Sequence, residues 1–247
     1  MLVLLPPSET KRRGGDGPPL DLARLSFSPL TGVRTRLVAA LVALAGDPAA
    51  ARAALGLSER QDAELASNAV LRGSATLPAL NRYTGVLYDA LDYPSLRPAA
   101  RGRADASLVV ASALFGLVRP TDPIPHYRLS GGTVLPGVGR LTTVWRPVAE
   151  PVLAAVGSER LVVDLRSTSY AALARVSGAV TVRVVTERAD GARVVVSHHN
   201  KATKGRLARA LVSAARTPRN IAGVLRVARA AGLTAERVGD QAIDIVT

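Results

Sequence analysis

The sequence contains no cysteine, and this absence excludes disulfide bonds and thiolate metal sites. Aromatic residues make up only 3% of the 247 residues, so alanine, valine and leucine fill most of the hydrophobic positions, which are 48% of the chain. No apolar run approaches the ~18 residues of a membrane-spanning helix. The apolar run at residues 2–5 ends at two prolines, which is not typical of a signal peptide. We therefore expect a soluble, cytoplasmic protein without a membrane partner.

Lysine is also scarce, because it occupies three positions, Lys11, Lys201 and Lys204, among 32 lysines and arginines. The excess of arginine is typical of a GC-rich genome, but codon bias does not account for a formal net charge of +13. Such a charge favours a polyanionic partner, either nucleic acid or a nucleotide-like anion, over a basic surface without a partner. Since a guanidinium cannot replace a compact ammonium in a tight pocket, the three lysines mark candidate functional positions, unless they survive by chance.

Hydrophobic patterns predict a chain in which strands and helices alternate. Continuous apolar runs at 2–5, 107–115, 160–165 and 242–246 predict buried strands. Helical spacing predicts helices at 30–46, 58–72, 78–91, 145–156, 167–176 and 201–215, with a capping box at Ser58 and Gln61. We expect one compact domain over residues 1–247, with a mixed α/β (α+β) fold in which helices surround a mixed sheet.

Two local signals refine this prediction. Ala189-Asp190-Gly191 joins two β-branched runs, which predicts a hairpin. Thr217 followed by Pro218 predicts the start of another helix, with threonine as its N-cap, and Gly232 predicts its end.

The hexapeptide at residues 135–140, LPGVGR, matches the hairpin of helix-hairpin-helix DNA-binding elements. Such an element needs a helix on each side, and the prolines and the Gly-Gly pair upstream prevent a helix of useful length there. The sequence favours a glycine turn between strands or before a helix. A contact of exposed amides with DNA phosphate stays open.

The segment at residues 194–211 passes from a strand into a helix and carries serine, histidine, asparagine and lysine to the helix N-terminus, a favourable place for an anion. A helical wheel places Lys201, Lys204 and Arg209 on one broad side and Leu207 and Leu211 on the other. Residues 201–237 contain nine basic residues and one acid. This imbalance favours a phosphate-binding surface over an ordinary solvated helix face.

The three histidines suggest hydrogen bonding or acid–base chemistry rather than metal binding. His198 and His199 are expected on a strand, where adjacent side chains point to opposite faces. With so few ligands and no cysteine, we expect no metal and no cofactor. One histidine of the pair is a candidate for acid–base chemistry or a phosphate contact.

Loops that follow parallel strands gather at one edge of a sheet. This geometry can bring together Lys11, Arg119, Arg128, Asp164 and Lys201, which all lie near predicted strand ends. The alternative for the loop at 116–129 is a structural brace in which Arg119 pairs with Asp122.

Six segments, taken in order, resemble the peroxide-stress protein YaaA family. They are residues 1–11, 83–91, 111–129, the segment around Trp145, 162–170 and 196–205. The resemblance implies a cytoplasmic bacterial protein that lowers hydrogen peroxide damage, with a single α/β domain, a basic cleft and DNA binding. It points to Ser8, Lys11, Tyr83, Gly85, Arg119, Pro120, Asp122, Tyr127, Arg128, Lys201 and Gly205.

Our leading hypothesis is a DNA-binding protein of the oxidative stress response, which holds DNA phosphates in the basic cleft without reading sequence. The predicted phosphate contacts are Ser8, Lys11, Arg119, Arg128, Lys201, Lys204, Arg206 and Arg209. Tyr83, Gly85, Pro120 and Gly205 are expected to serve the structure.

The alternative is an enzyme that acts on a nucleotide, a nucleobase or another small phosphate-bearing substrate in the same pocket. Its candidate catalytic residues are Lys11, Asp122, Tyr127, Asp164, Tyr170, His198 and Lys201. A scaffold for protein partners has little support, because no large apolar stripe is left unassigned. The sequence leaves open whether the protein catalyses a reaction.

Overall fold

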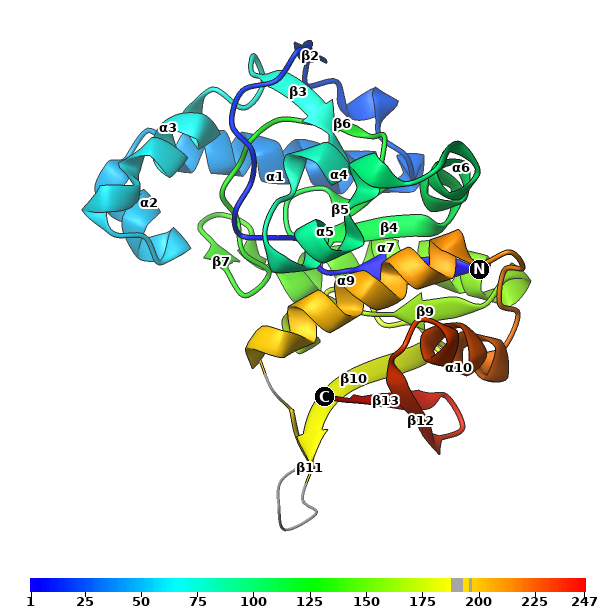
Figure 1. Cartoon of the computed structure of the whole chain (residues 1–247). Coiled ribbons are helices and arrows are strands. Elements are labelled where there is room, and N and C mark those ends of the chain that lie inside the picture. The colour runs from blue at the N-terminus through cyan, green and yellow to red at the C-terminus, as the bar shows by residue number, and fades with distance from the viewer. Residues whose placement is uncertain (188–192, 196) are drawn as a thin grey trace.

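The computed structural model describes residues 1–187, 193–195 and 197–247, with the backbone alone at residues 195 and 197–199. An eight-stranded sheet has the order β12-β13-β10-β9-β1-β4-β5, with β11 beside β10 (Figure 1). Its strands are β1 (Leu2–Leu5), β4 (Leu108–Ser112), β5 (Gly116–Val118), β9 (Val162–Asp164), β10 (Val180–Glu187), β11 (Arg193–Val195), β12 (Thr234–Gly239) and β13 (Ala242–Val246). The inner strands are parallel, and β5, β11 and β12 pair antiparallel. These observations confirm the predicted mixed α/β fold.

Strand β1 is an inner strand of the sheet, and all four of its residues are completely buried. It pairs in parallel with β4 on one side and β9 on the other, where Val3 lies opposite Leu108 and Val163. A parallel strand covered on both faces reads as a continuous apolar run, which explains the run at 2–5. The strand order reverses at β1, so the loop after it lies where open α/β sheets bind ligands.

Two smaller sheets complete the strands. β2 (Gly17–Pro19) and β6 (Pro123–Ile124) flank β3 (Ala75–Pro78), and β7 (Val134–Leu135) pairs with β8 (Gly139–Arg140). The hexapeptide at 135–140 therefore forms the turn of the β7–β8 hairpin, as the favoured interpretation predicted. A helix follows it, but a strand precedes it, so it is not a helix-hairpin-helix element.

The helices are α1 (Thr31–Leu44), α2 (Pro48–Leu55), α3 (Asp62–Ala69), α4 (Ala79–Arg82), α5 (Val86–Leu91), α6 (Pro98–Ser107), α7 (Leu141–Glu159), α8 (Thr168–Ala171), α9 (Ser197–Ser213) and α10 (Ile221–Ala230). Short 3₁₀ turns are η1 (Leu22–Arg24), η2 (Ser28–Leu30), η3 (Glu59–Gln61) and η4 (Tyr93–Ser95). The capping box of Ser58 and Gln61 is present at η3. Within the described part of the chain, no helix has both the length and the apolar character needed to cross a membrane.

Three local predictions were wrong or incomplete. Helix α10 begins after Asn220, not at Thr217, because Asn220 Oδ1 accepts a hydrogen bond from the Gly223 amide at 2.9 Å. The helix expected at 167–176 is the single turn α8. His198 and His199 lie in the first turn of α9 rather than on a strand, since that helix starts at Ser197. The pairing of β10 with β11 agrees with the hairpin prediction, whose turn at Ala189-Asp190-Gly191 lies outside the described residues.

Helix α9 is packed on several sides, because it contacts α5, α6, α10 and β10 (Figure 1). Leu207 and Leu211 are buried, as the helical wheel predicted. Lys204 is also buried, with 8% of its surface exposed, so the prediction of an exposed Lys204 was wrong. At Gly205 the backbones of α9 and α5 come so close that a Cβ atom would lie 2.2 Å from the Leu87 carbonyl oxygen.

We expect Gly205→Ala to lower the free energy of unfolding by roughly 1–3 kcal/mol or more, because its methyl group would overlap the α5 backbone. Gly102→Ala in α6 is the matched control, since nothing lies within 4 Å of its Cβ position. The control should stabilise the helix by about 0.5–1 kcal/mol. Urea unfolding of both variants measures these values, and a stabilised Gly205→Ala protein would contradict the close packing.

Candidate functional site

A buried arginine fixes the loop that follows β1. Arg82 is fully buried, and its guanidinium donates hydrogen bonds to main-chain carbonyls of Arg12, Gly14 at 2.8 Å and Ile124 at 3.1 Å. These carbonyls belong to the loop after β1 and to β6. The loop also makes an isolated β-bridge between Lys11 and Tyr83. The position of Lys11 is therefore set by main-chain contacts rather than by its own side chain.

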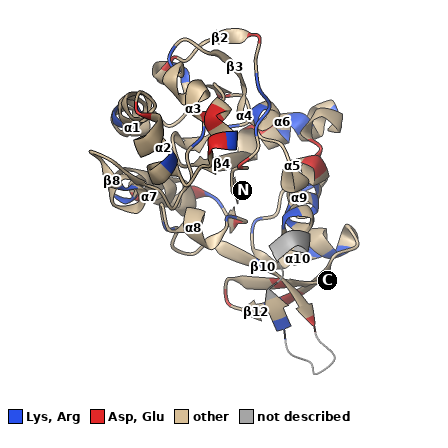
Figure 2. Ribbon diagram, turned by 90° about the vertical axis from the view of Figure 1, so that its left-hand side faces the viewer, with Lys and Arg blue, Asp and Glu red and all other residues tan. Residues whose placement is uncertain are grey.

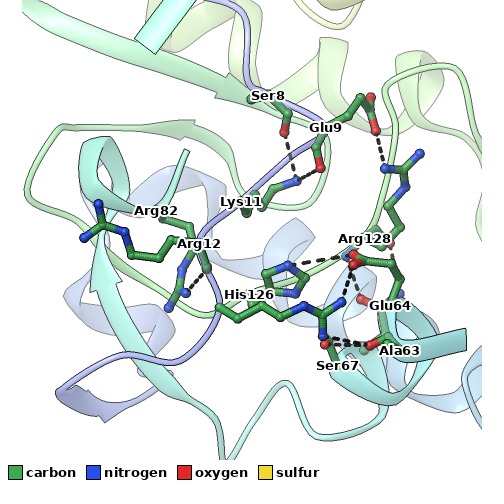
Figure 3. A network of polar contacts seen from close by, with 12 residues as sticks. Ser8, Glu9, Lys11, Arg12, Ala63, Glu64, Ser67, Arg82, His126 and Arg128 are labelled. Atoms are coloured by element: carbon green, nitrogen blue, oxygen red, sulfur yellow. Dashed lines mark hydrogen bonds and ion pairs between the residues drawn. The ribbon is translucent and has the colours of Figure 1, made fainter. Parts of the chain in front are cut away.

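The Lys11 ammonium lies between main-chain oxygens and aromatic rings. Its Nζ donates hydrogen bonds to the carbonyls of Ser8 at 3.0 Å and Glu9 at 3.4 Å (Figure 3). It lies 4.4 Å from the ring centre of Tyr127 and 5.6 Å from that of Tyr83. No described carboxylate is within ion-pair distance of it. Burial lowers the pKa of Lys11 to about 8, against the smaller opposing effect of the Glu9 charge.

Three hydroxyl groups form a chain beside this lysine. The Tyr83 and Tyr127 hydroxyls are 2.8 Å apart, and the Tyr127 hydroxyl is 2.7 Å from Ser112 Oγ at the end of β4. Burial raises the pKa of Tyr83 to about 12 and raises that of Tyr127 well above its ordinary value. The phenols therefore stay neutral at physiological pH and act as hydrogen-bonding groups.

Lys11 borders a pocket of about 260 Å³ between the loop after β1, η3–α3 and the segment after β6. Its ionisable lining residues are Glu9, Lys11, Arg13, Arg60, Glu64, His126 and Arg128. The four cations exceed the two carboxylates, so the formal charge of the lining is +2 with histidine neutral. The pocket therefore favours an anionic ligand.

Ion pairs hold most of the pocket's charges in place. Glu9 pairs with Arg128 at 3.1 Å, and Glu64 pairs with Arg13 at 2.6 Å and lies 3.8 Å from His126 Nε2 (Figure 3). His126 is 9% exposed, and its Nδ1 has no hydrogen-bond partner among the described residues. Burial lowers its pKa from about 6.5 to about 4, although Glu64 opposes this shift. The imidazole is therefore neutral near pH 7.

Arg119 and Asp122 do not line the pocket. The buried Asp122 carboxylate accepts hydrogen bonds from the Ser26 hydroxyl at 2.7 Å and from the Arg119 amide at 2.9 Å. The brace considered for this loop thus forms through the main chain of Arg119. Its guanidinium donates to the Ala106 carbonyl at 3.1 Å and lies 5.3 Å from the ring centre of Phe27.

A second polar group lies at the end of β9. Arg166 makes a bidentate ion pair with Asp164, with hydrogen bonds of 2.9 and 2.7 Å. Lys204 Nζ donates to the Arg166 carbonyl at 3.2 Å, and burial lowers the pKa of Lys204. The buried Tyr170 hydroxyl accepts a hydrogen bond from the Gly131 amide at 3.2 Å. These residues contact one another and do not line the Lys11 pocket.

The remaining cations of α9 differ in their contacts. Arg209 donates hydrogen bonds to the carbonyls of Leu91 at 2.9 Å and Asp92 at 2.8 Å and so connects α9 to the end of α5. Lys201 and Arg206 are exposed, and neither pairs with a described carboxylate. The side chain of His198 lies outside the described residues.

The glycine and proline positions of the resemblance have structural roles. Gly85 has a φ of 95° and approaches the loop after β1, where a Cβ atom would lie 3.4 Å from Ser8 Oγ. Ser8 Oγ is itself 3.1 Å from Thr10 Oγ1. The Pro120 carbonyl accepts a hydrogen bond from the Leu80 amide at 3.1 Å.

Sequence reasoning missed most of the pocket wall. Arg13, Arg60 and Glu64 were not among the candidates, nor was Glu9. The only available signal was the dense charge of residues 59–64 after the capping box. Among the described residues, no group of three or more His, Asp or Glu side chains could hold a metal ion.

The model of a family described as "Peroxide stress protein YaaA" matches residues 1–234. A UPF0246 protein of Corynebacterium efficiens is 50% identical over 240 residues, which cover 96% of this chain and 95% of the relative. A UPF0246 protein of Streptomyces coelicolor is 47% identical over 239 residues, which cover 96% and 92%. A UPF0246 protein of Corynebacterium glutamicum is 49% identical over 240 residues.

The buried His126 should make the protein sensitive to acid. Its pKa of about 4 in the folded state lies below its ordinary value, so the unfolded chain binds more protons between about pH 6.5 and 4. Its contribution to stability should therefore fall as the pH drops through this window. Between pH 7 and 4 the free energy of unfolding should fall in both proteins, and the fall should be about 1–2 kcal/mol smaller in His126→Gln than in wild type. Urea titrations at several pH values measure this difference, and parallel pH profiles would contradict it.

Proposed function

The chain belongs to the peroxide stress protein YaaA family, which supports a role in the oxidative stress response, and we propose that it acts there by binding DNA. The observation that carries this proposal is a set of exposed cations on α9, the loop after it and α10. Lysine and arginine gather along α9 (Figure 2). The α9–α10 cations, as they are called below, are Lys201, Arg206, Arg216, Arg219 and Arg226. Arg229 on α10 is also exposed, but its Nε donates a hydrogen bond to the Ala235 carbonyl at 2.9 Å, so it is not counted among them.

The α9–α10 cations are available to bind phosphate because, within the described chain, none of them forms an ion pair. Arg209 and Lys204 are already engaged in internal hydrogen bonds, so we assign them to the structure rather than to DNA. Phosphate contacts release counterions from DNA and bind without regard to base sequence. The low aromatic content gives no support to base stacking on the protein surface. We therefore expect binding of double-stranded DNA without sequence preference.

We expect Lys201→Ala combined with Arg206→Ala to weaken DNA binding. The logarithm of the binding constant falls as the logarithm of the salt concentration rises. Loss of two phosphate contacts should make this fall less steep by about 2 units of slope. Fluorescence anisotropy with a duplex at several salt concentrations measures both affinity and slope. The double variant removes exposed side chains, so the fold should persist.

Arg24→Ala combined with Arg36→Ala is the matched control, because both arginines are exposed and lie on η1 and α1. It removes the same charge and should leave the salt slope unchanged. Equal losses in the two double variants would indicate a diffuse charge effect and would contradict a binding surface on α9 and α10.

A second candidate function is an enzyme acting on a nucleotide or another small phosphate-bearing compound. The observation that favours it is the placement of Lys11 at the wall of a pocket with excess positive charge. Such a protein should gain thermal stability from a nucleotide and not from a duplex. A melting screen with mono-, di- and triphosphates, beside a duplex, tests this expectation. A rise in Tm with the duplex alone would contradict it.

A further inference from the structure

We propose that Lys11 is the reactive amine of a small-molecule site, and that its ligand is a compact compound with a carbonyl group and a phosphate group. This inference deepens the second candidate function and rests on the same pocket. At about 260 Å³ the pocket lies just below the range of about 300–1,000 Å³ common for drug-sized ligands, so a compact ligand is expected.

Lys11 is an amine at the wall of a pocket, and in the described structure it has no carboxylate partner. Its hydrogen-bond acceptors are two main-chain carbonyls, and no described carboxylate forms an ion pair with it. The ammonium also lies 4.4 Å from the ring centre of Tyr127 and 5.6 Å from that of Tyr83. With a pKa of about 8, roughly a quarter of Lys11 is neutral at pH 7.5, whereas an ordinary lysine is about 0.1% neutral. An amine must be neutral to attack a carbonyl carbon.

The expected step is a condensation without any change in oxidation state. The neutral Nζ attacks the carbonyl carbon, a C–N bond forms, and a proton moves from nitrogen to oxygen to give a carbinolamine. The carbinolamine hydroxyl then takes up one proton from solvent, the C–O bond breaks, oxygen leaves as water, and a protonated imine remains. His126 lines the same pocket, which makes its imidazole the candidate for proton exchange during this step.

Arg60 is the cation best placed to receive the phosphate group. Arg13 and Arg128 are paired with Glu64 and Glu9, but in the described structure Arg60 has no carboxylate partner. Arg60 lies on η3 and Lys11 on the loop after β1, and both residues line the pocket. An aldehyde at Lys11 and a phosphate at Arg60 would therefore engage two different segments of the pocket wall.

The test uses pyridoxal 5′-phosphate as probe and pyridoxal, which lacks the phosphate, as its matched control. The intact protein is treated at pH 7.5 with either aldehyde below stoichiometry, reduced with borohydride, digested and analysed by mass spectrometry. The chain has only three lysines and the Met1 amine, so each adduct is assigned directly. We expect the phosphate probe to label Lys11 at least ~10-fold more than the exposed Lys201.

Three further outcomes decide the proposal. The phosphate probe should exceed pyridoxal at Lys11 but not at Met1, and Arg60→Ala should abolish this excess while leaving pyridoxal labelling unchanged. Lys11→Arg, which keeps the charge, should lose only the Lys11 adduct. Labelling of Lys11 no greater than that of Lys201 would overturn the reactive amine, and equal labelling by both aldehydes would overturn the phosphate contact. If nucleotides give no rise in Tm while Lys11 is still labelled, the second candidate function fails as stated for nucleotides and the Lys11 proposal does not. The two failures are therefore distinguishable.

Discussion

The hydrogen bonds of the buried Arg82 guanidinium are the interaction on which the candidate pocket depends. They join carbonyls from the loop after β1, from β3 and from β6. Arg82 is 68 residues from Gly14 and 42 residues from Ile124 along the chain. Arg34 makes a similar set of bonds to the Phe115 and Leu117 carbonyls. A fully buried charge is tolerated only when its hydrogen bonds are largely satisfied. These bonds fix the loop after β1 to β3 and β6, and this loop carries Lys11 to the pocket.

The three lysines have three different environments. Lys11 is held by carbonyls and aromatic rings, Lys204 is buried with its ammonium on the Arg166 carbonyl, and Lys201 is exposed. In the first two positions a bulky planar guanidinium would have to displace neighbouring atoms, which agrees with the argument that a compact ammonium is needed there. Nothing in the surroundings of Lys201 requires lysine. The scarcity of lysine therefore drew attention to two partly or fully buried ammonium groups, Lys11 and Lys204.

The sequence allowed prediction of those elements that carry their own pattern. The apolar runs predicted β1, β4 and β9, and the capping box of Ser58 and Gln61 marked a helix start correctly. Helices α2 and α6 were missed because alanine and arginine fill them and leave no clear hydrophobic stripe. The pocket could be predicted only in part, since Lys11 and Arg128 were candidates, but Glu9, which pairs with Arg128, and Glu64, which pairs with Arg13, were not. The approach of η3–α3 to the loop after β1 is a tertiary contact across about 50 residues that no local pattern records.

The contact at Gly205 has a consequence for the motion of α9. Because its backbone lies directly against the Leu87 carbonyl, the helix cannot roll about its own axis without driving the neighbouring Cβ atoms into α5. The rotation of α9 about its axis is therefore fixed, and with it the direction in which each of its side chains points. The outward direction of Arg206, one residue further on, follows from the absence of a side chain at its neighbour.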